Sequence, residues 1–186
     1  HKFQGMPLNG YTALIESILD HENINIHLNT ELLRGNLENF DHVFWSGPLD
    51  SYFDFDIGRL PYRTLTFEKQ TIDGDYQGTA VMNYPDADVP YTRITDHKYF
   101  SPWESHDKSV IFREYSSECG VDDIPYYPVH LNSENNTLAE YQRRAILEKN
   151  ITFVGRLGTY RYLDMDITIR HALDEASNFL SSNHYS

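Results

Sequence analysis

Residues 151–166 read ITFVGRLGTYRYLDMD, an apolar run followed by a turn that carries two arginines, two tyrosines and two aspartates. The run at 151–154 is typical of a short buried strand, and residues 167–180 have the spacing of a helix. The glycines at 155 and 158 let the backbone approach a ligand closely, and a helix start directs free N–H groups toward an anion. This unit therefore predicts a ligand site. It is also compatible with an aspartate that only caps the helix and arginines that lie in water.

The two ends of the chain share this alternation of helix and strand patterns. Residues 14–19 follow helical spacing, and residues 24–28 alternate between apolar and polar side chains as a half-buried strand does. Residues 43–45 indicate a buried strand of the kind found in parallel sheets. The spacing of a capping box at Thr137 and Glu140 predicts a helix that ends near residue 149.

The middle of the chain has a different pattern, with alternating runs separated by turn signals. These runs predict strands near residues 61–69, 76–83, 89–97 and 109–115. Asp73-Gly74 is predicted to be a hairpin turn. The region is therefore expected to form an antiparallel sheet, and the fold class is α+β.

Composition excludes several classes of protein. A net charge of −13 over 186 residues argues against binding to nucleic acid or to an anionic membrane, since both need a basic field. No apolar run approaches the roughly 18 residues that cross a bilayer. The single cysteine, Cys119, excludes an internal disulfide and indicates a reducing compartment. The nine histidines lack close ligand spacing, so we expect no metal site.

Two arginines stand inside predicted strands, where the side chain either points to solvent or meets an anion. They are Arg63 and Arg93, and we expect them to share one face of the sheet with Asn83. Tyrosine-rich patches, among them those at Tyr127 and Tyr162, accompany the arginines. A guanidinium binds diphosphate oxygens with two donors, and a phenol adds a hydrogen bond without a charge. These residue types therefore suit a diphosphate ligand.

Five short blocks of sequence together resemble one known family. They are FQGMP at 3–7 with GY at 10–11, NY and DA within 83–87, VPYTRI at 89–94, PYYP at 125–128, and GRL through DMD at 155–166. In this order they resemble the bacterial form of UDP-galactopyranose mutase, from residue 1 to about residue 180. The resemblance covers the second half of that family, and the first half would precede His1.

The resemblance implies an isomerase that interconverts UDP-galactopyranose and UDP-galactofuranose, the furanose donor for cell-surface polysaccharides. The implied cofactor is FAD, active when reduced, whose N5 attacks the anomeric carbon of the sugar. The implied partner is UDP-galactose, with no nucleic acid and no membrane insertion. The implied setting is the cytoplasm, and the full-length enzyme is expected to be a homodimer.

The resemblance also assigns roles to individual residues. The catalytic positions are Arg93, which would bind the substrate diphosphate, and Asp164. The other substrate-binding positions are Tyr127, Tyr162, Asn83 and Arg63. The cofactor-binding positions are Arg156, Met165 and Asp164, and no metal ligand is implied.

The fold that the resemblance implies is a twisted antiparallel sheet flanked by strand and helix pieces of an incomplete FAD-binding α/β domain of the Rossmann type. Residues 1–50 would belong to the FAD-binding domain, residues 51–120 to the sheet on the substrate side, and residues 121–186 again to the FAD-binding domain. The chain has no Gly-x-Gly-x-x-Gly turn, which is the usual FAD phosphate site. We therefore expect the chain to be inactive alone.

Two other interpretations stay open. One is a non-catalytic nucleotide-sugar or carbohydrate-binding domain that uses the tyrosine-rich sheet. The other is a fragment of a related flavin amine oxidase-like enzyme. A diphosphate ligand such as Arg93 favours the mutase over the amine oxidase, because an amine substrate does not need it.

Overall fold

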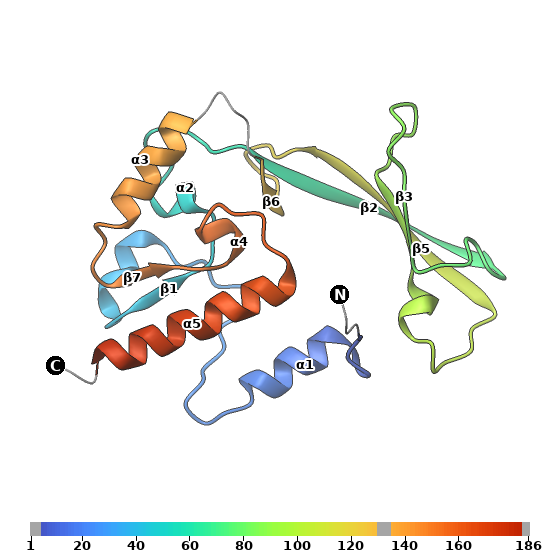
Figure 1. Cartoon of the computed structure of the whole chain (residues 1–186), viewed down its shortest axis with the longest axis horizontal. Helices are drawn as coiled ribbons and strands as arrows, with labels where there is room; N and C mark the ends of the chain where they lie inside the picture. The colour runs from blue at the N-terminus through green and yellow to red at the C-terminus, as the bar shows by residue number, and fades with distance from the viewer. Residues whose placement is uncertain (1–4, 130–134, 184–186) are drawn as a thin grey trace. The chain divides into compact units, whose positions relative to one another are not determined.

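The computed structural model describes residues 5–129 and 135–183. The chain divides into two compact units, residues 1–31 with 66–116 and residues 32–65 with 117–186. Helices and an antiparallel sheet are both present (Figure 1), so the predicted α+β class is confirmed. The domain limits at residues 50 and 120 stay a prediction.

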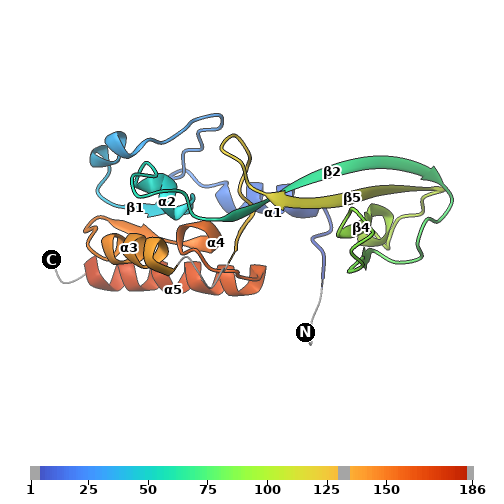
Figure 2. The ribbon, with the colours of Figure 1, turned by 90° about the horizontal axis from the view of Figure 1, so that it is seen from above.

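A five-stranded sheet has the order β3-β4-β5-β2-β6. Its strands are β2 (Tyr62–Asp73), β3 (Val81–Asn83), β4 (Arg93–Asp96), β5 (Lys108–Glu118) and β6 (Tyr127–Pro128). The pairs β3–β4, β4–β5 and β2–β6 are antiparallel. The long strands β2 and β5 lie side by side as a twisted ribbon in two views (Figures 1 and 2).

One face of the sheet is buried in the first unit, which also holds α1 (Gly10–Leu19) and η2 (His97–Phe100). Ile94, Asp96, Ser109 and Ile111 are fully buried, and the Ser109 hydroxyl donates to Asp96 Oδ2 over 2.6 Å. Successive side chains of a strand point to opposite faces. The residues between these four therefore present their side chains on the other, more open face.

The predicted strand at 76–83 and the predicted hairpin at Asp73-Gly74 are wrong. Only Val81–Asn83 forms a strand, and β2 lies beside β5 rather than beside β3. Gly74 has a φ of +78° and donates its N–H to Asp107 O over 2.8 Å. The Tyr76 N–H then donates to Ser109 Oγ over 3.1 Å. These bonds tie the chain after β2 to the start of β5, so it does not fold back as a hairpin.

The predicted strand at residues 24–28 is also wrong. The described chain has no strand there, and Ile24, Ile26 and Leu28 are exposed. Alternating side chains stabilise a strand only where a neighbouring strand and a buried face exist. The predicted helices at 14–19, 137–149 and 167–180 correspond to α1, α3 (Asn135–Ala145) and α5 (Met165–Asn183).

The second unit contains a short parallel sheet with helices on both faces. Its strands are β1 (Val43–Trp45) and β7 (Ile151–Phe153), the two apolar runs predicted to be buried strands. The rings of Trp45 and Phe153 contact Tyr52 of α2 (Leu49–Tyr52) on one face. On the other face, the ring centroids of Phe44 and Phe179 of α5 are 5.4 Å apart. Figures 1 and 2 both show α5 running along this sheet.

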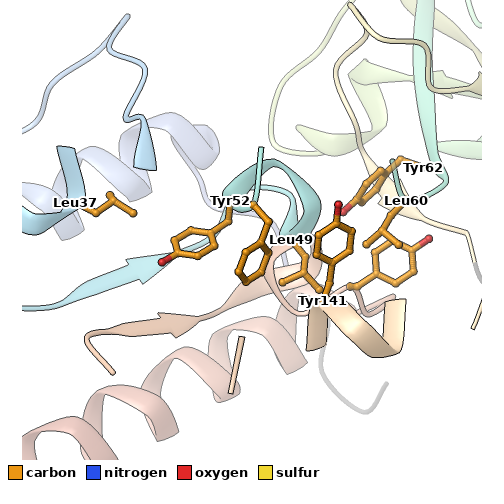
Figure 3. Packing of buried hydrophobic residues seen from close by; sticks show 8 residues of the cluster. Leu37, Leu49, Tyr52, Leu60, Tyr62 and Tyr141 are labelled. Atoms are coloured by element: carbon orange, nitrogen blue, oxygen red, sulfur yellow. The ribbon is translucent and has the colours of Figure 1, made fainter. Parts of the chain in front are cut away.

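The core of the second unit is rich in tyrosine (Figure 3). Its buried members are Leu37 of η1 (Arg34–Asn39), Leu49, Tyr52, Phe53, Leu60, Tyr62, Tyr141 and Tyr160. The buried Asp50 accepts hydrogen bonds from the Leu60 N–H over 2.8 Å and from the Tyr62 hydroxyl over 3.2 Å. Burial raises the pKa of Asp50 and that of Tyr62. The tyrosine therefore stays protonated and acts as a donor.

Close packing holds the turn between β7 and α5. Its first part is α4 (Gly155–Gly158), and a Cβ on Gly158 would lie 2.5 Å from the carbonyl oxygen of Trp45. The buried Tyr160 has a φ of +50° and donates its hydroxyl to the carbonyl oxygens of Pro61 and Val129. Tyr160 is therefore a core residue of this turn and fixes the path that leads into α5.

Candidate functional site

In the first unit, three polar side chains form a row across neighbouring strands. Asn83, Arg93 and Glu114 are cross-strand partners in β3, β4 and β5. Directly paired residues of antiparallel strands point to the same face, so Asn83 and Arg93 share a face as expected. Arg93 Nε donates to Asn83 Oδ1 over 3.0 Å, and Arg93 Nη1 lies 3.5 Å from Glu114 Oε2. The row orients the guanidinium from both sides.

Arg93 is oriented by these contacts but is not covered by them. Its side chain is 46% exposed, whereas that of Glu114 is only 15% exposed. The Thr92 hydroxyl donates to Glu114 Oε1 over 3.1 Å and so helps to fix the carboxylate. The partly buried carboxylate of Glu114 thus holds one side of the Arg93 guanidinium, and the exposed side of the guanidinium is open to a ligand.

In the second unit, four of the predicted site residues are linked in a chain of contacts. Arg63 of β2 and Tyr127 of β6 are cross-strand partners and therefore share a face. The rings of Tyr127 and Tyr162 meet edge to face at 5.6 Å between centroids. The guanidinium carbon of Arg156 lies 4.6 Å from the centroid of the Tyr162 ring. The structure therefore brings together residues that are nearly a hundred positions apart.

Arg156 also holds the turn that leads to α5. Its Nε and Nη2 donate to the carbonyl oxygen of Leu163 over 3.1 and 2.5 Å. A guanidinium has five N–H donors, so further donors are available to a ligand.

Asp164 and Met165 stand at the start of α5, and both are exposed. The carbonyl oxygen of Asp164 accepts the N–H of Thr168 over 2.9 Å, which is the first hydrogen bond of the helix. The predicted site residues thus divide between the two units. The first unit contains Asn83 and Arg93, and the second contains Arg63, Tyr127, Arg156, Tyr162, Asp164 and Met165.

The row around Arg93 and the contact chain from Arg63 to Arg156 each offer hydrogen-bond donors suited to an anion. The row in the first unit presents one oriented guanidinium, and the contact chain in the second unit contains two guanidinium groups and two phenols. Charge-assisted hydrogen bonds from arginine are the strong ones for phosphate oxygens. Among the described residues, no cluster of His, Cys, Asp and Glu has the geometry of a metal site.

Sequence reasoning did not identify Glu114 as a partner of Arg93, nor Thr92 as a partner of Glu114. The signal was present in part, because Glu114 falls in the predicted strand 109–115. Its pairing with Arg93 depends on the register of β4 against β5, which the sequence pattern does not fix.

The opposite face of the sheet in the first unit carries a tyrosine cluster. Tyr84, Tyr91 and Tyr115 meet edge to face at centroid distances of 4.9 and 6.1 Å. The Tyr115 hydroxyl donates to Glu68 Oε2 over 2.9 Å, and this hydrogen bond raises the pKa of Tyr115. None of the predicted site residues belongs to this cluster.

A hollow of about 650 Å³ in the first unit also lies apart from the predicted site. Its lining includes His97, Lys98, His106 and Lys108. Lys98 and Lys108 already lie 3.7 and 3.1 Å from aspartate oxygens, so their charges are partly compensated. None of the predicted site residues is among those that line this hollow.

Comparison with known proteins identifies the family of this chain. Residues 1–162 match the family described as UDP-galactopyranose mutase. The chain belongs to this family. The match covers every predicted site residue except Asp164 and Met165, which follow its last matched position.

Relatives in bacteria extend the similarity over nearly the whole chain. The chain is 63% identical over 182 residues to a probable UDP-galactopyranose mutase of Klebsiella pneumoniae, which covers 98% of this chain and 47% of the relative. It is 50% identical over 190 residues to the dTDP-fucopyranose mutase of Escherichia coli, covering 98% and 50% respectively. A UDP-galactopyranose mutase of Mycoplasma pneumoniae is 32% identical over 197 residues, covering 95% and 48%. The chain thus spans about half the length of these relatives.

The fold is also similar to that of a solved protein. The crystal structure of a reduced UDP-galactopyranose mutase superposes with a TM-score of 0.51 over 66% of this chain and 37% of that protein, at 15% identity. The described helices include none that is long and apolar enough to span a bilayer.

Proposed function

We propose that this chain is the part of a nucleotide-sugar mutase that binds the diphosphate of UDP-galactose while the sugar ring changes between pyranose and furanose forms. The observation that carries the proposal is the Arg93 guanidinium, half open to solvent and oriented by Asn83 and Glu114. The family membership of the chain supplies the substrate class.

In the proposed reaction, negative charge develops on the diphosphate as the bond between UDP and the anomeric carbon breaks. Arg93 stabilises this charge, and because Asn83 and Glu114 already orient it, little reorganisation is needed at that moment. Within the second unit, Tyr127 and Tyr162 lie edge to face with Arg63 beside Tyr127, and the family resemblance assigns these two phenols to hydrogen bonds with substrate oxygens, which adds no charge. Asp164 holds the sugar end of the substrate.

The residues present fit one side of a flavin site. Arg156 keeps N–H donors beyond those that bind Leu163 O, and the exposed Met165 stands beside Asp164 at the start of α5. These three residues would contact FAD in the full-length enzyme. When bound in its reduced form, FAD supplies through N5 the nucleophile for the anomeric carbon. The fingerprint turn for its phosphates is not in this sequence, which supports the proposal that the chain alone is inactive.

The Escherichia coli relative favours a second candidate substrate, dTDP-fucose, since 50% identity extends over 98% of the chain. The same diphosphate chemistry would serve both sugars. The other interpretations are less favoured: family membership favours the mutase over an amine oxidase-like enzyme, and it also favours an enzyme part over a domain that only binds.

A chimera tests the proposal. The half of the Klebsiella pneumoniae relative that this chain does not span is joined in front of the chain, and the reduced protein is assayed with UDP-galactofuranose and with dTDP-fucofuranose. We expect isomerisation of the UDP sugar. Arg93→Ala should lower turnover by about a hundredfold or more, with flavin occupancy unchanged. Arg93→Lys should recover only part of the loss, because lysine lacks the two-donor fork.

Arg143→Ala is the matched control, since Arg143 is an exposed arginine of α3 whose ion pair among the described residues is with Glu140 of the same helix, at 2.7 Å. It should leave turnover unchanged. Near-wild-type turnover of Arg93→Ala would remove Arg93 from the mechanism, and loss of flavin would reassign Arg93 to the cofactor. Faster turnover of the dTDP sugar would select the second candidate.

A further inference from the structure

Tyr160 has a backbone conformation that bulky residues seldom adopt. Its φ is +50°, which lies in the left-handed region. A bulky residue stays in that region only where its surroundings fix it, and such residues are concentrated at ligand sites. Tyr160 stands in the turn between β7 and α5, two positions after the end of α4 and two before Tyr162. The left-handed turn therefore marks a point that the rest of the second unit holds in place.

The side chain of Tyr160 is held at both its ring and its hydroxyl. It is 2% exposed, and its ring meets the Tyr62 ring edge to face at 5.3 Å between centroids. Its hydroxyl donates to the carbonyl oxygens of Pro61 over 2.6 Å and of Val129 over 2.9 Å. A tyrosine hydroxyl has one hydrogen, so the two carbonyl groups share it. The hydroxyl therefore ties the segment that enters β2 to the segment that leaves β6.

This tie matters for β6 because the strand is short and contains a proline. Pro128 has no N–H and donates no hydrogen bond to the sheet. The Val129 N–H donates to Pro61 O over 3.0 Å, so the backbone and the Tyr160 hydroxyl bind the same carbonyl oxygen. Tyr127 lies two residues before Val129 in the chain. The Tyr160 hydroxyl therefore helps to fix the strand that carries the Tyr127 phenol.

The backbone of Tyr160 determines the path to Tyr162. The Tyr160 N–H donates to Leu157 O over 3.2 Å in the turn that follows α4. The left-handed φ then turns the chain, and two residues later the centroid of the Tyr162 ring lies 5.6 Å from that of Tyr127. The same Tyr162 ring lies 4.6 Å from the guanidinium carbon of Arg156. One buried residue thus holds the two segments that carry Tyr127 and Tyr162.

We propose that Tyr160 is a positioning residue, which places the phenols of Tyr127 and Tyr162 for their hydrogen bonds with the substrate. Tyr160 itself is buried, and its hydroxyl binds two carbonyl groups of the chain. It acts on Tyr127 through β6 and on Tyr162 through the left-handed turn. A hydrogen bond weakens steeply as its distance and angle depart from the optimum, so a small displacement of the two phenols lowers affinity. The inference rests on the proposed function, which gives the two phenols a substrate to bind.

A matched pair of variants tests the proposal in the chimera with the Klebsiella pneumoniae half. Tyr160→Phe keeps the ring and removes the hydroxyl. Tyr141→Phe does the same at another buried tyrosine, whose hydroxyl donates to Gly58 O over 2.8 Å and which is outside the contact chain. UDP is titrated into each oxidised protein in a calorimeter. We expect Tyr160→Phe to weaken UDP binding at least about fivefold with flavin occupancy unchanged, and Tyr141→Phe to change it less than about twofold.

A second background separates positioning from a general loosening of the protein. The double variant Tyr127→Phe/Tyr162→Phe lacks both phenol hydroxyls, so adding Tyr160→Phe should weaken UDP binding by less than about a further twofold. A further loss as large as that in the unmodified background would mean that Tyr160 does not act through the two phenols, and the proposal would be wrong.

Hydrogen exchange reports on β6 without any ligand. The amides of Tyr126 and Val129 donate to carbonyl oxygens at and just before the start of β2, and they should exchange at least about tenfold faster in Tyr160→Phe but not in Tyr141→Phe. Unchanged exchange would overturn the proposal, as would faster exchange with unchanged UDP affinity. Failure of Tyr160→Phe to fold where Tyr141→Phe folds would assign Tyr160 to the core alone.

The unmodified chimera separates this inference from the proposed function. If it binds no UDP, the proposed function is rejected, and the exchange rates still decide whether Tyr160 holds β6. If it binds UDP and Tyr160→Phe binds UDP as tightly, only the role of Tyr160 is rejected.

Discussion

Among the glycines, Gly158 has the least room for a side chain. A Cβ there would lie 2.5 Å from the Trp45 carbonyl oxygen and 3.5 Å from that of Gly47, and both are backbone atoms that cannot rotate away. We expect Gly158→Ala to destabilise the chain by about 1–3 kcal/mol through overpacking. Gly35→Ala is the control, because its Cβ would meet nothing within 4 Å. Urea denaturation measures both, and equal midpoints for the two variants would show that the turn shifts without cost.

Asp50 gives a prediction that depends on pH. Burial raises its pKa above the ordinary value of about 3.9, so the stability that this group contributes is full below that value and falls as pH rises through the folded pKa. Asp50→Asn removes an acceptor for the Leu60 N–H or the Tyr62 hydroxyl, at a cost of about 1–3 kcal/mol. The cost should be larger near pH 4 than at pH 7.

The measurement is the difference in unfolding free energy between Asp50→Asn and the unmodified chain at each pH. The other carboxylates are common to both proteins and cancel in this difference. A cost that grows as pH rises would mean that the ionised form of Asp50 is the stabilised one, contrary to the effect of its burial.

At the scale of single elements, one arginine attaches α3 to the core of the second unit. Arg144 donates from Nη1 and Nη2 to the two carboxylate oxygens of Asp56 over 2.9 and 2.7 Å, and its guanidinium carbon lies 4.4 Å from the Phe53 ring centroid. Arg144→Lys keeps the charge but loses the fork and the stacking. We expect a clearly lower denaturation midpoint for Arg144→Lys and almost no change for Arg143→Lys.

Lowering the pH tests whether the ion pair between Arg144 and Asp56 causes this stability difference. The hydrogen bond from Arg144 lowers the pKa of Asp56, so the pair's contribution is present above the ordinary pKa of an aspartate and is lost as pH falls through the lowered value. The difference between Arg144→Lys and the unmodified chain should therefore shrink at strongly acidic pH. A difference that persists there would assign the effect to the Phe53 contact.

The sequence predicted helices and strands correctly where the local pattern and the tertiary contacts favour the same element. The apolar runs at 43–45 and 151–153 become paired strands, and the helical spacings become α1, α3 and α5. The prediction failed at residues 24–28, where alternation exists but the described chain forms no strand, and in the first part of 76–83, where only Val81–Asn83 pairs with another strand. At 76–83 the decisive bonds run from Gly74 and Tyr76 to residues 107 and 109, and such long-range pairing is not encoded in a local period.

For the whole molecule, residue chemistry was easier to predict than spatial grouping. Resemblance singled out Asn83 and Arg93, and strand alternation then placed them on one face. The contact chain of Arg63, Tyr127, Tyr162 and Arg156 depends on β6 pairing with the start of β2 across more than sixty residues. No period in the sequence specifies that pairing, because register and strand order are set by the packing of the complete sheet.

The last prediction concerns the chain as a cofactor binder. A dinucleotide is held chiefly by backbone N–H groups of a glycine-rich turn at a helix start, and no Gly-x-Gly-x-x-Gly sequence occurs here. What the chain offers is one guanidinium, Arg156, two of whose donors already bind Leu163 O. Purified chain mixed with FAD and freed of excess flavin by gel filtration should therefore be colourless, whereas the chimera with the relative's other half should retain flavin near stoichiometry. Stoichiometric flavin absorbance on the chain alone would contradict this, and would mean that the segment from Gly155 to Met165 binds the cofactor without the fingerprint turn.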